Sequence, residues 1–512
     1  MTILWADDEI DLLKPHILFL EERGYSVIPV TSGSEAVEEL EENVADIVFL
    51  DENMPGISGL ETLSAIKARW PQVPVVMITK SEEEHIMDEA IGGKISDYLI
   101  KPVNPHQILL AVKKHTEARR LQSEKSTMSY QQQFRELAME MGNRLDYNEW
   151  IQLYKKIVYW DLELSNTQDE NIHEIFESQK QEANRLFCRF YEDNYTDWLL
   201  GGTKPLMSPT VLKERMFPLL DSERPVFLIV VDNFRYDQWK YLQPTIEQYF
   251  KVERDEVFYS ILPTTTQYAR NAMFAGLMPS EIEKKYPQFW VNEGEDGNKN
   301  DHESELLDEN LRRHGFNLRH TYNKVLNAQY GKKVVDQLPN LLHNKLNVII
   351  YNFIDMLSHA RTDSNIVREL AADEKGYRSV TLSWFEHSPL LDCLKVLAEK
   401  DVEVIITTDH GSTKVDNPVR IKGDKEVSVN LRYKQGRLLE YNPKQVFEVS
   451  SKNGFLPALH ATSKPYIFAR SGDFFAYPNN YNQYVQYYMN TFQHGGVSLE
   501  EVLIPFVHLR RK

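Results

Sequence analysis

The sequence is poor in cysteine and lacks long apolar runs, and both shortages narrow the kind of protein it encodes. Only two cysteines, Cys188 and Cys393, occur in 512 residues, and their separation matches no metal-binding or redox spacing. A disulfide scaffold is therefore excluded, and a reducing compartment is expected. No stretch approaches the ~18 uninterrupted apolar residues of a membrane-spanning helix. The first residues, MTILWADDEIDLL, carry no basic segment, so we expect no signal peptide and a cytoplasmic location.

An excess of basic residues is also missing. The formal net charge is −18, the isoelectric point is near 5.4, and no basic stripe stands out along the chain. Binding to duplex DNA depends largely on Lys and Arg that neutralise phosphates, so we expect no direct duplex DNA binding. No helix-turn-helix motif is recognisable either. A small anionic substrate stays compatible with this charge, because bound metal ions reverse the local field.

Residues 1–120 alternate short apolar runs with amphipathic segments. The apolar runs are strand-like, and helical patterns lie between them: TILWA, SVIPV, DIVFLD, PVVMIT and DYLI. This alternation is typical of a parallel sheet with helices on both faces. We therefore expect an α/β domain at residues 1–120.

Residues 121–205 predict a small helical bundle. Two long stretches are rich in helix formers and carry apolar residues at spacings of three and four: YNEWIQLYKKIVYWDLEL and DENIHEIFESQKQEANRLFCRFYEDNYTDWLL. Asp169 is suited to cap the second of these helices. The aromatic residues are interpreted as core packing, and GGTKP at residues 201–205 marks the next boundary.

Residues 206–512 predict a second and larger α/β domain. Apolar strands alternate again with helical segments: PVFLIVVD, EVFYSILP, NVIIYNF, VEVIITTD, KPYIFAR and EVLIPFVHL. In open α/β sheets, functional groups gather outside the carboxyl ends of the strands. Polar residues that follow strands are therefore the candidates for a site in both α/β domains.

In the first domain, acidic, hydroxyl and basic side chains follow four strands: Asp7 and Asp8, Asp51, Thr79, and Lys101. Grouped carboxylates repel one another, and a hard divalent cation relieves that repulsion. Mg²⁺ takes oxygen ligands and keeps several waters, so Asp8 and Asp51, with the Asn53 backbone carbonyl, could bind it. Asp51 would then attack a phosphoryl donor while Mg²⁺ and Lys101 neutralise the developing charge.

These residues resemble a bacterial two-component receiver domain. The resemblance rests on the acidic pair, the DENMPGISG context of Asp51, the Lys-Pro dipeptide and Tyr98 at the switch-aromatic position. It implies a flavodoxin-like, CheY-type fold, a Mg²⁺ site at Asp7, Asp8, Asp51 and Asn53, and a phospho-acceptor at Asp51. It further implies that Thr79, Tyr98 and Lys101 form the switch, and that a sensor histidine kinase is the phosphodonor.

In the second domain, potential metal ligands and a hydroxyl follow four strands and precede a fifth: Asp232, Thr264 to Thr266, Asp355 with His359, Asp409 with His410, and His494 before the last strand. Each alone could be a turn residue, a helix-surface pair or a core histidine, but their coincidence indicates one site. Asp and His suit zinc, and three protein ligands leave a position open for substrate. Seven groups suit two ions ~4 Å apart, which clamp the attacking and leaving oxygens of phosphoryl transfer.

This pattern resembles the alkaline phosphatase superfamily, particularly its nucleotide pyrophosphatase/phosphodiesterase-like and PglZ branches, over residues 206–512. The resemblance implies one zinc ion on Asp232, Asp409, His410 and Thr266. It implies a second zinc ion on Asp355, His359 and His494. The TTDHG and HGG elements carry the resemblance in combination.

The nucleophile is the second threonine of a Pro-Thr-x-Thr turn in the phosphodiesterase branch, which selects Thr266. Thr264 and Thr265 stay open as alternatives. No residue is clearly placed to hold the non-bridging phosphate oxygens; Arg235 and Arg270 are near the site in sequence, but either could simply pair with neighbouring acids. No third metal cluster of the monoesterase kind is evident, which favours diesters such as cyclic or linear oligonucleotides.

The combination of a receiver, a helical bundle and a PglZ-like domain closely resembles the response regulators of type IX secretion. That resemblance implies contacts with an alternative sigma factor or the secretion motor, and a homodimer on phosphorylation. The helix after Lys101 runs on towards the bundle, which offers a route from Asp51 to the second domain. The leading hypothesis is a phosphorylation-controlled, zinc-dependent phosphodiesterase. The alternative is a zinc-stabilised interaction module with little catalytic output.

Overall fold

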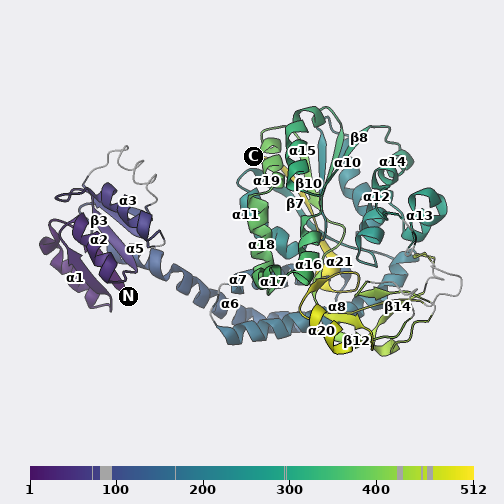
Figure 1. Cartoon of the computed structure of the whole chain (residues 1–512), viewed down its shortest axis with the longest axis horizontal. Helices are drawn as coiled ribbons and strands as arrows, with labels where there is room; N and C mark the ends of the chain where they lie inside the picture. Colours follow the sequence, from purple (N-terminus) through teal and green to yellow (C-terminus); the bar gives the residue numbers. More distant parts are fainter. Residues whose placement is uncertain are drawn as a thin grey trace. The chain divides into compact units, whose positions relative to one another are not determined.

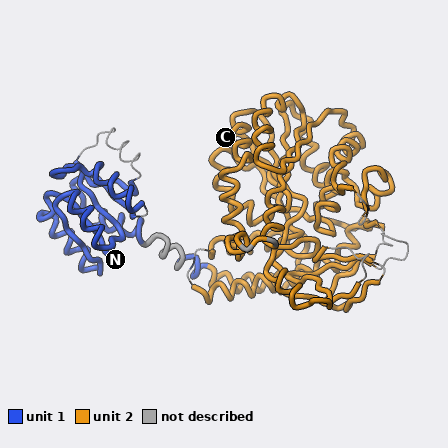
Figure 2. Tube along the Cα trace, in the orientation of Figure 1, with its two compact units in different colours: residues 1–129, 166–168 blue, residues 130–165, 169–512 orange. Residues whose placement is uncertain are grey.

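The computed structural model describes residues 1–71, 73–80, 95–165, 167, 169–292, 295, 297–423, 430–436, 438–450, 454–457 and 465–512. The chain divides into two compact units, residues 1–129 with 166–168 and residues 130–165 with 169–512 (Figure 2). Most of the segment predicted as a separate bundle, residues 121–205, thus packs with the second unit. The predicted domain boundaries at residues 120 and 205 stay a prediction.

The first unit is a five-stranded parallel sheet in the order β2-β1-β3-β4-β5. Its strands are the five that the sequence predicts: β1 (Thr2–Ala6), β2 (Ser26–Val30), β3 (Ile47–Asp51), β4 (Val75–Thr79) and β5 (Asp97–Ile100). The helices described here are α1 (Lys14–Glu21), α2 (Gly33–Glu42), α3 (Gly59–Arg69) and α5 (Pro105–Val112). This strand order is that of the flavodoxin-like fold, so the predicted fold class is confirmed.

Successive residues of the central strands point to opposite faces of this sheet. Trp5 and Phe49 pack into one apolar core together with Ile108 of α5. Leu4 and Leu50 pack into a second core with Leu63 of α3. Both faces are therefore covered by helices, and the polar residues that end β1, β3 and β4 are left at one edge.

Three long helices follow the first sheet. Helical residues run without a break from α5 through a π-helical turn, η2 (Lys113–Glu117), into α6 (Ala118–Met141). Helices α7 (Tyr147–Leu164) and α8 (Glu170–Leu199) come next. The Asp169 side chain accepts bonds from the backbone N–H groups of Asn171 and Ile172, which confirms the predicted cap.

Aromatic side chains join α7 and α8 to the large sheet of the second unit. Tyr259, at the end of a strand of the second sheet, lies 6.3 Å from the Phe187 ring and 5.4 Å from the Trp198 ring. Trp150 of α7 lies 5.4 Å from Phe187. The predicted core role of these aromatic residues is confirmed, and the helices share one continuous apolar core with the sheet.

The second unit contains a six-stranded sheet in the order β7-β18-β10-β6-β9-β8. Its strands are β6 (Val226–Val231), β7 (Phe250–Tyr259), β8 (His320–Val325), β9 (Leu346–Tyr351), β10 (Glu403–Thr407) and β18 (Leu503–Arg511). Strand β18 runs antiparallel to both of its neighbours, and the other described pairs are parallel. Five of the six were predicted; β8 was not.

Helices cover this sheet on both flanks, with α11 and α18 on one side and α12 and α14 on the other (Figure 1). The helices are α9 (Ser208–Val211), α10 (Phe217–Leu220), α11 (Tyr236–Ile246), α12 (Asn271–Ala275), α13 (Pro279–Lys285), α14 (Glu303–Arg313), α15 (Ala328–Leu341), α16 (Phe353–Asp363), α17 (Asn365–Leu370), α18 (Glu374–Glu386), α19 (Pro389–Ala398), α20 (Tyr481–Tyr488) and α21 (Leu499–Val502).

Smaller sheets lie between β10 and β18 in the sequence. Their strands are β11 (Thr413–Lys414), β12 (Asn417–Arg420), β13 (Tyr433–Lys434), β14 (Phe447–Val449), β15 (Tyr466–Phe468), β16 (Asp473–Ala476) and β17 (Phe492–Gln493). They pair as β11-β17, β12-β16 and β13-β15-β14. The predicted KPYIFAR strand is therefore β15, which lies in a small sheet and not in the large one.

Candidate functional site

The topology of the large sheet brings the predicted ligands to one edge. Strands β6, β9 and β10 run in the same direction, so Asp232, Asp355 and Asp409 all follow carboxyl ends. Strand β7 runs parallel to these three, since both it and β10 are antiparallel to β18, and Thr266 follows it. Because β18 starts at this same edge, the segment before it delivers His494.

The first group of ligand atoms belongs to Asp232, Asp409 and His410, which are fully buried. His410 Nε2 lies 3.8 Å from Asp232 Oδ1 and 3.7 Å from Asp409 Oδ2. His410 Nδ1 lies 3.1 Å from the Gly411 carbonyl oxygen, and this bond requires the hydrogen on Nδ1. The lone pair of Nε2 is thereby aimed at the two carboxylates, as metal-binding histidines are held.

Thr266 is the threonine whose hydroxyl contacts this group. Thr266 Oγ1 lies 3.3 Å from Asp232 Oδ1 and 3.3 Å from His410 Nε2. It opens the π-helical turn η4 (Thr266–Arg270), directly after the Thr265 cap. The Thr264 hydroxyl is instead buried, donates to the Gly496 carbonyl and accepts from the Gly495 N–H. Thr265 Oγ1 is buried and has no hydrogen-bond partner among the described residues.

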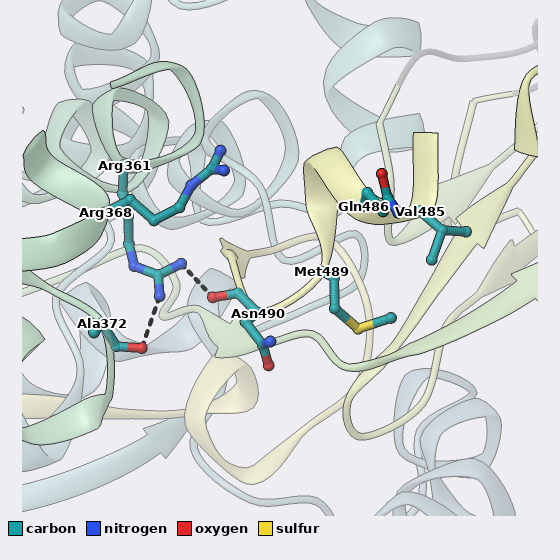
Figure 3. A pocket seen from close by; sticks show the side chains of 7 residues that line it. All are labelled: Arg361, Arg368, Ala372, Val485, Gln486, Met489 and Asn490. Carbon is teal, nitrogen blue, oxygen red and sulfur yellow. Dashed lines mark hydrogen bonds between the residues drawn. The ribbon is translucent and has the colours of Figure 1, made fainter. Parts of the chain in front are cut away.

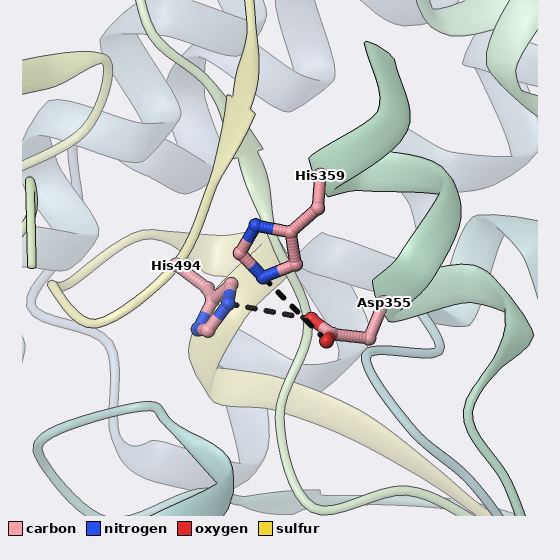
Figure 4. A group of neighbouring side chains, drawn as sticks. All are labelled: Asp355, His359 and His494. Carbon is pink, nitrogen blue, oxygen red and sulfur yellow. Dashed lines mark ion pairs between the residues drawn. The ribbon is translucent and has the colours of Figure 1, made fainter. Parts of the chain in front are cut away.

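The second group consists of Asp355, His359 and His494 (Figure 4). His494 Nε2 lies 3.4 Å from Asp355 Oδ1, and His359 Nε2 lies 3.6 Å from Asp355 Oδ2. Asp355 and His359 are one turn apart on α16, so both face the loop that carries His494. His494 Nδ1 lies 3.2 Å from the Thr264 carbonyl oxygen, which again leaves Nε2 for the ligand side.

The two groups are neighbours. The rings of His410 and His494 are stacked with their centroids 4.4 Å apart. Exposure differs across the pair, because the His359 side chain is 66% exposed whereas Asp232 is 1% exposed. The first group is thus the closed end of the site, and the second group is the end that solvent reaches.

Burial and mutual repulsion of the carboxylates dominate the electrostatics. Burial raises the pKa of Asp232 well above its usual value, and the charge of Asp409 raises it further. Asp409 Oδ2 is buried and has no hydrogen-bond partner among the described residues. Arg270 NH1 lies 3.8 Å from this oxygen. A buried carboxylate oxygen without a hydrogen bond is costly, and a divalent cation at this position would reduce the cost. The donor set therefore fits a metal ion in each group.

The side chains of Arg270 and Arg235 both form ion pairs with neighbouring acids. Arg270 is buried and donates to Asp232 Oδ2 at 2.9 Å and to Glu303 Oε1 at 2.6 Å. Arg235 is fully buried and pairs with Asp237 and Glu374. The sequence left open whether these arginines hold substrate or pair with acids. In the structure both guanidinium groups are paired with acids. Substrate binding by either residue stays a prediction.

Asn233 is a site residue that the sequence reasoning missed. Its backbone φ of 62° is left-handed, a conformation that Asn tolerates better than most residues. Its N–H points to Asp409 Oδ1 at 3.5 Å, and its side-chain Nδ2 lies 3.5 Å from Asp355 Oδ1. One residue therefore bridges carboxylates of both groups. Its position directly after Asp232 is the only signal that the sequence offered.

Gly411 follows the Asp409-His410 pair because the chain passes close to α21 there. A Cβ atom at this position would lie 2.0 Å from the Glu500 carbonyl oxygen. The Gly411 N–H donates to the Glu501 carbonyl at 3.1 Å. The glycine therefore allows a backbone approach that fixes the loop carrying His410.

In the first unit, Asp7, Asp8 and Asp51 bring carboxylate oxygens within 4.8 Å of one another. Lys101 Nζ lies 2.8 Å from Asp7 Oδ2 and 3.1 Å from Asp51 Oδ1. Burial raises the pKa of Asp51 above its usual value, although Lys101 opposes this. Asp8 is exposed beside this buried pair, and the three acids fit a hard cation with oxygen ligands.

The remaining predicted switch residues lie beside this group. Thr79 is fully buried at the end of β4, and the Tyr98 hydroxyl is hydrogen-bonded to it. Asn53 is exposed two residues after Asp51. The structure therefore places the predicted residues of the first unit around one strand-end crevice, and their roles as ligands and switch stay predictions.

Family profiles match along the whole chain. The profile of the BREX system PglZ alkaline phosphatase-like domain matches residues 211–509, more than half of the chain. The chain belongs to the PglZ family. In this PglZ chain, the response regulator receiver domain profile matches residues 3–113, and the PorX response regulator linker domain profile matches residues 120–199. Alkaline-phosphatase-like and receiver domains typically bind metal ions, and a receiver implies a phosphodonor such as a histidine kinase.

Curated relatives match over shorter stretches. The alginate biosynthesis regulator AlgB of Pseudomonas putida is 35% identical over 119 residues, 23% of this chain and 27% of its own length. The sensory transduction protein RegX3 of Mycobacterium bovis is 32% identical over 22% of this chain and 49% of its own. A cyclic di-GMP phosphodiesterase of Thermotoga maritima is 32% identical over 22% and 30%. The chain thus spans between a quarter and a half of these relatives.

Solved structures of receiver domains also match. A CheY-like receiver from Methanospirillum hungatei is 26% identical, covers 23% of this chain and 93% of its own, and gives a TM-score of 0.22. A receiver from Clostridium thermocellum is 29% identical, with 23% and 97% covered and a TM-score of 0.22.

None of the helices in the described part of the chain combines the length and apolar character needed to cross a membrane.

Proposed function

We propose that this PglZ chain is a response regulator whose second unit is a zinc-dependent phosphodiesterase with Thr266 as nucleophile. The observation that carries the proposal is the position of Thr266 Oγ1, 3.3 Å from both Asp232 Oδ1 and His410 Nε2. A site built only to hold a structural metal would be closed by another side-chain ligand. Here a hydroxyl takes that place, and nucleophilic hydroxyls are activated in such surroundings.

Two groups of residues would hold the ions. Asp232, Asp409 and His410 would bind one zinc ion, and the second group would bind the other: Asp355, His359 and His494. Bound zinc would lower the pKa of a hydroxyl or water and neutralise charge on the phosphoryl oxygens.

The chain's own residues then define the reaction. Thr266 Oγ1 loses its proton to solvent and attacks phosphorus in line with the leaving oxygen. A new P–O bond forms to Thr266 as the P–O bond to the leaving alcohol breaks, and that alcohol oxygen takes a proton from solvent. Water hydrolyses the phosphothreonine and restores the hydroxyl. Asn233 holds Asp355 and Asp409 at fixed positions throughout.

The family matches and the sequence support a proposal for the substrate class and for its control. We infer a diester substrate of the cyclic or linear oligonucleotide class. Phosphorylation of Asp51 by a histidine kinase, with Mg²⁺ on Asp7, Asp8, Asp51 and the Asn53 carbonyl, would control hydrolysis. The match to the PorX linker profile supports a cytoplasmic role in type IX secretion, with a sigma factor or the secretion motor as partner and a phosphorylation-dependent homodimer.

The test compares hydrolysis of bis-p-nitrophenyl phosphate and short oligonucleotides by Thr266→Val and Thr265→Val at equal, verified zinc content. Both substitutions exchange a hydroxyl for a methyl group. We expect Thr266→Val to lose at least about a thousandfold in rate. Thr265→Val should stay near the wild-type rate, because that hydroxyl has no partner among the described residues.

Equal activity of wild type and Thr266→Val would overturn the nucleophile assignment. Loss of activity in Thr265→Val alone would reassign the nucleophile to that residue. If the zinc-loaded wild type hydrolyses neither substrate, the site is better explained as the core of a metal-stabilised interaction module, whose partner contacts would carry the output.

A further inference from the structure

A cavity of about 460 Å³ is lined by residues of α16, α17, α20 and the segments next to them (Figure 3). Its volume is within the range of about 300–1,000 Å³ typical of small-molecule sites. Figure 3 shows Arg361 and Arg368 on one side and Val485 and Gln486 of α20 on the other. The remaining lining residues are Ala372, Met489 and Asn490.

The described residues that line this cavity include two arginines and no acid, in a chain whose net charge is −18. Arg361 is 1% exposed, and its guanidinium donates to the backbone carbonyls of Ala371, Ala372 and Asn490. These contacts use three of its five N–H donors. Its charge has no carboxylate partner within ion-pair distance among the described residues.

Arg368 adds a second unmatched cation. Its NH2 group donates to the Thr362 carbonyl at 2.7 Å, whereas its Nε is buried with no hydrogen-bond partner among the described residues. A buried donor left unpaired costs about 1–3 kcal/mol. An anionic group in the cavity would offset the repulsion between the two guanidinium groups.

The cavity and the second ligand group are built on the same two segments of the chain, α16 and the segment before β18. Arg361 is two residues beyond His359 on α16, and Asn490 is four residues before His494. The Gln493 side chain lies 3.5 Å from Thr362 Oγ1, which joins the two segments between cavity and ligands. Val485 and Met489 supply an apolar wall opposite the arginines, suited to a flat base or a sugar.

We propose that this cavity binds a phosphate group of a nucleotide, held by Arg361 and Arg368. The phosphate is either a terminal phosphate of an oligonucleotide in the catalytic site or a free phosphate ligand. Binding of an oligonucleotide's terminal phosphate rests on the proposed function, whereas binding of a free phosphate ligand does not. Guanidinium groups bind phosphate through paired N–H donors, so both residues contribute directionally as well as by charge.

The experiment uses the full-length, metal-loaded Thr266→Val chain, so that binding is read without hydrolysis. Calorimetry measures binding of 5′-phosphorylated diadenylate, of the same dinucleotide without the 5′-phosphate, and of inorganic phosphate. Arg368→Gln removes the charge, and Val485→Trp fills the cavity at unchanged charge. Arg312→Gln, which removes an exposed arginine 67% accessible on α14, is the matched control.

We expect the 5′-phosphate to strengthen dinucleotide binding by about tenfold or more. Arg368→Gln and Val485→Trp should both abolish that preference, and Arg312→Gln should keep it. Equal binding of the two dinucleotides, with a phosphate-binding event that only the two cavity variants lose, would assign the cavity to free phosphate.

Unchanged binding of all three probes in Arg368→Gln and Val485→Trp would overturn the proposal. Because hydrolysis is not the readout, an inactive enzyme would leave this result interpretable. Conversely, if the wild type hydrolyses diesters but Arg368→Gln binds all three probes as tightly as the parent chain does, the proposed phosphodiesterase activity stands and the proposed phosphate site does not.

Discussion

At the scale of single residues, hydrogen bonds to main-chain carbonyls decide which atoms face the proposed metal sites. His410 and His494 each direct Nδ1 to a carbonyl oxygen and leave Nε2 beside carboxylates. Asn233, with its left-handed φ, links a carboxylate of each group. The ligand geometry is thus set by backbone positions, and substitutions that disturb those positions should act on metal affinity.

Substitution of Asn233 tests this view. Asn233→Ala removes the bridge and puts a Cβ-bearing residue without a polar group in the left-handed region; we expect metal affinity or hydrolysis to fall by about 10–100-fold. Asn233→Gly also loses the bridge but accepts the backbone angle, so it should be about 1 kcal/mol more stable than the alanine variant. Metal content by mass spectrometry and thermal unfolding measure the two effects.

Wild-type metal affinity in both variants would show that the bridge does not position the carboxylates. Equal stability of the two variants would show that the φ of Asn233 carries no measurable cost.

Asp232 and Asp409 could be read from the sequence as ligand candidates because they stand at the ends of apolar strands. Asn233 could not be found in this way. Its role depends on a backbone angle and on Asp355, which lies 122 positions further along the chain. The pairing of Arg235 and Arg270 with acids was likewise undecided until the fold placed their partners.

At the scale of elements, a buried network of charges joins α7 and α8 to the helices of the α/β sheet. Asp161 of α7 lies 3.0 Å from Lys180 Nζ and 2.9 Å from Arg378 NH2. Arg378 also reaches Asp237 Oδ2 at 3.0 Å, and Asp237 pairs with Arg235. Apolar periodicity predicts the helices themselves, but it says nothing about which charged residues are buried between them.

Asp161→Asn should destabilise the second unit in a pH-dependent way. Lys180 and Arg378 hold the pKa of Asp161 at about 2 despite its burial. A carboxylate with a lowered folded-state pKa stabilises fully above its unfolded value, near 4, and loses this effect as pH falls towards 2. We expect a loss of about 3 kcal/mol near pH 7, and the gap to wild type should narrow by about 2 kcal/mol between pH 4 and pH 2.

Denaturant unfolding followed by near-ultraviolet circular dichroism measures both quantities. Glu140→Gln breaks the partly exposed pair with Lys156 and serves as the control, with an expected change below about 1 kcal/mol. A gap that stays constant or widens as the pH falls would contradict the assigned role of Asp161.

The strand predictions were most successful where both faces of a strand are covered. Strands such as β6 and β10 are buried at every position, so they read as unbroken apolar runs. Strand β8 lies at the sheet edge and is only partly buried over most of its length, and its sequence, HTYNKV, shows no such run. Its existence follows from pairing with β9, which is a tertiary contact.

At the scale of the whole molecule, one helical run passes from the first unit into the second. The π-helical turn η2 lies within this run, directly before α6, and π-turns often occur at functional positions. Asp97 Oδ2 contacts Lys114 Nζ at 2.8 Å and His115 Nε2 at 3.0 Å. Asp97 directly precedes Tyr98, so the predicted switch aromatic and the start of the long helix are linked through one carboxylate.

Asp97→Asn should weaken the response to phosphorylation without preventing phosphorylation. The amide cannot form charge-assisted bonds with both Lys114 and His115, so the turn η2 is held less firmly against β5. We expect phosphorylation-dependent dimerisation, measured by analytical ultracentrifugation, to weaken by about tenfold. Phosphate incorporation at Asp51 is measured in parallel.

Glu41→Gln, which breaks the exposed pair with Arg69 in the same unit, is the matched control and should behave like wild type. Equal dimerisation of Asp97→Asn and wild type would exclude this carboxylate from the coupling. If the molecular mass of the wild type in ultracentrifugation does not change on phosphorylation, the proposed phosphorylation-dependent dimer is wrong.

The place of β18 has a consequence for the biosynthesis of this protein. This strand is the last of the described strands in sequence, yet it lies between β7 and β10 in the sheet. A nascent chain on the ribosome therefore exposes the edges of both strands until β18 has been translated. Exposed strand edges are templates for aggregation, and His494 emerges only shortly before β18. The second ligand group would therefore be complete only once the segment before β18 has emerged, so that metal binding there and closure of the sheet would fall at the same stage of synthesis.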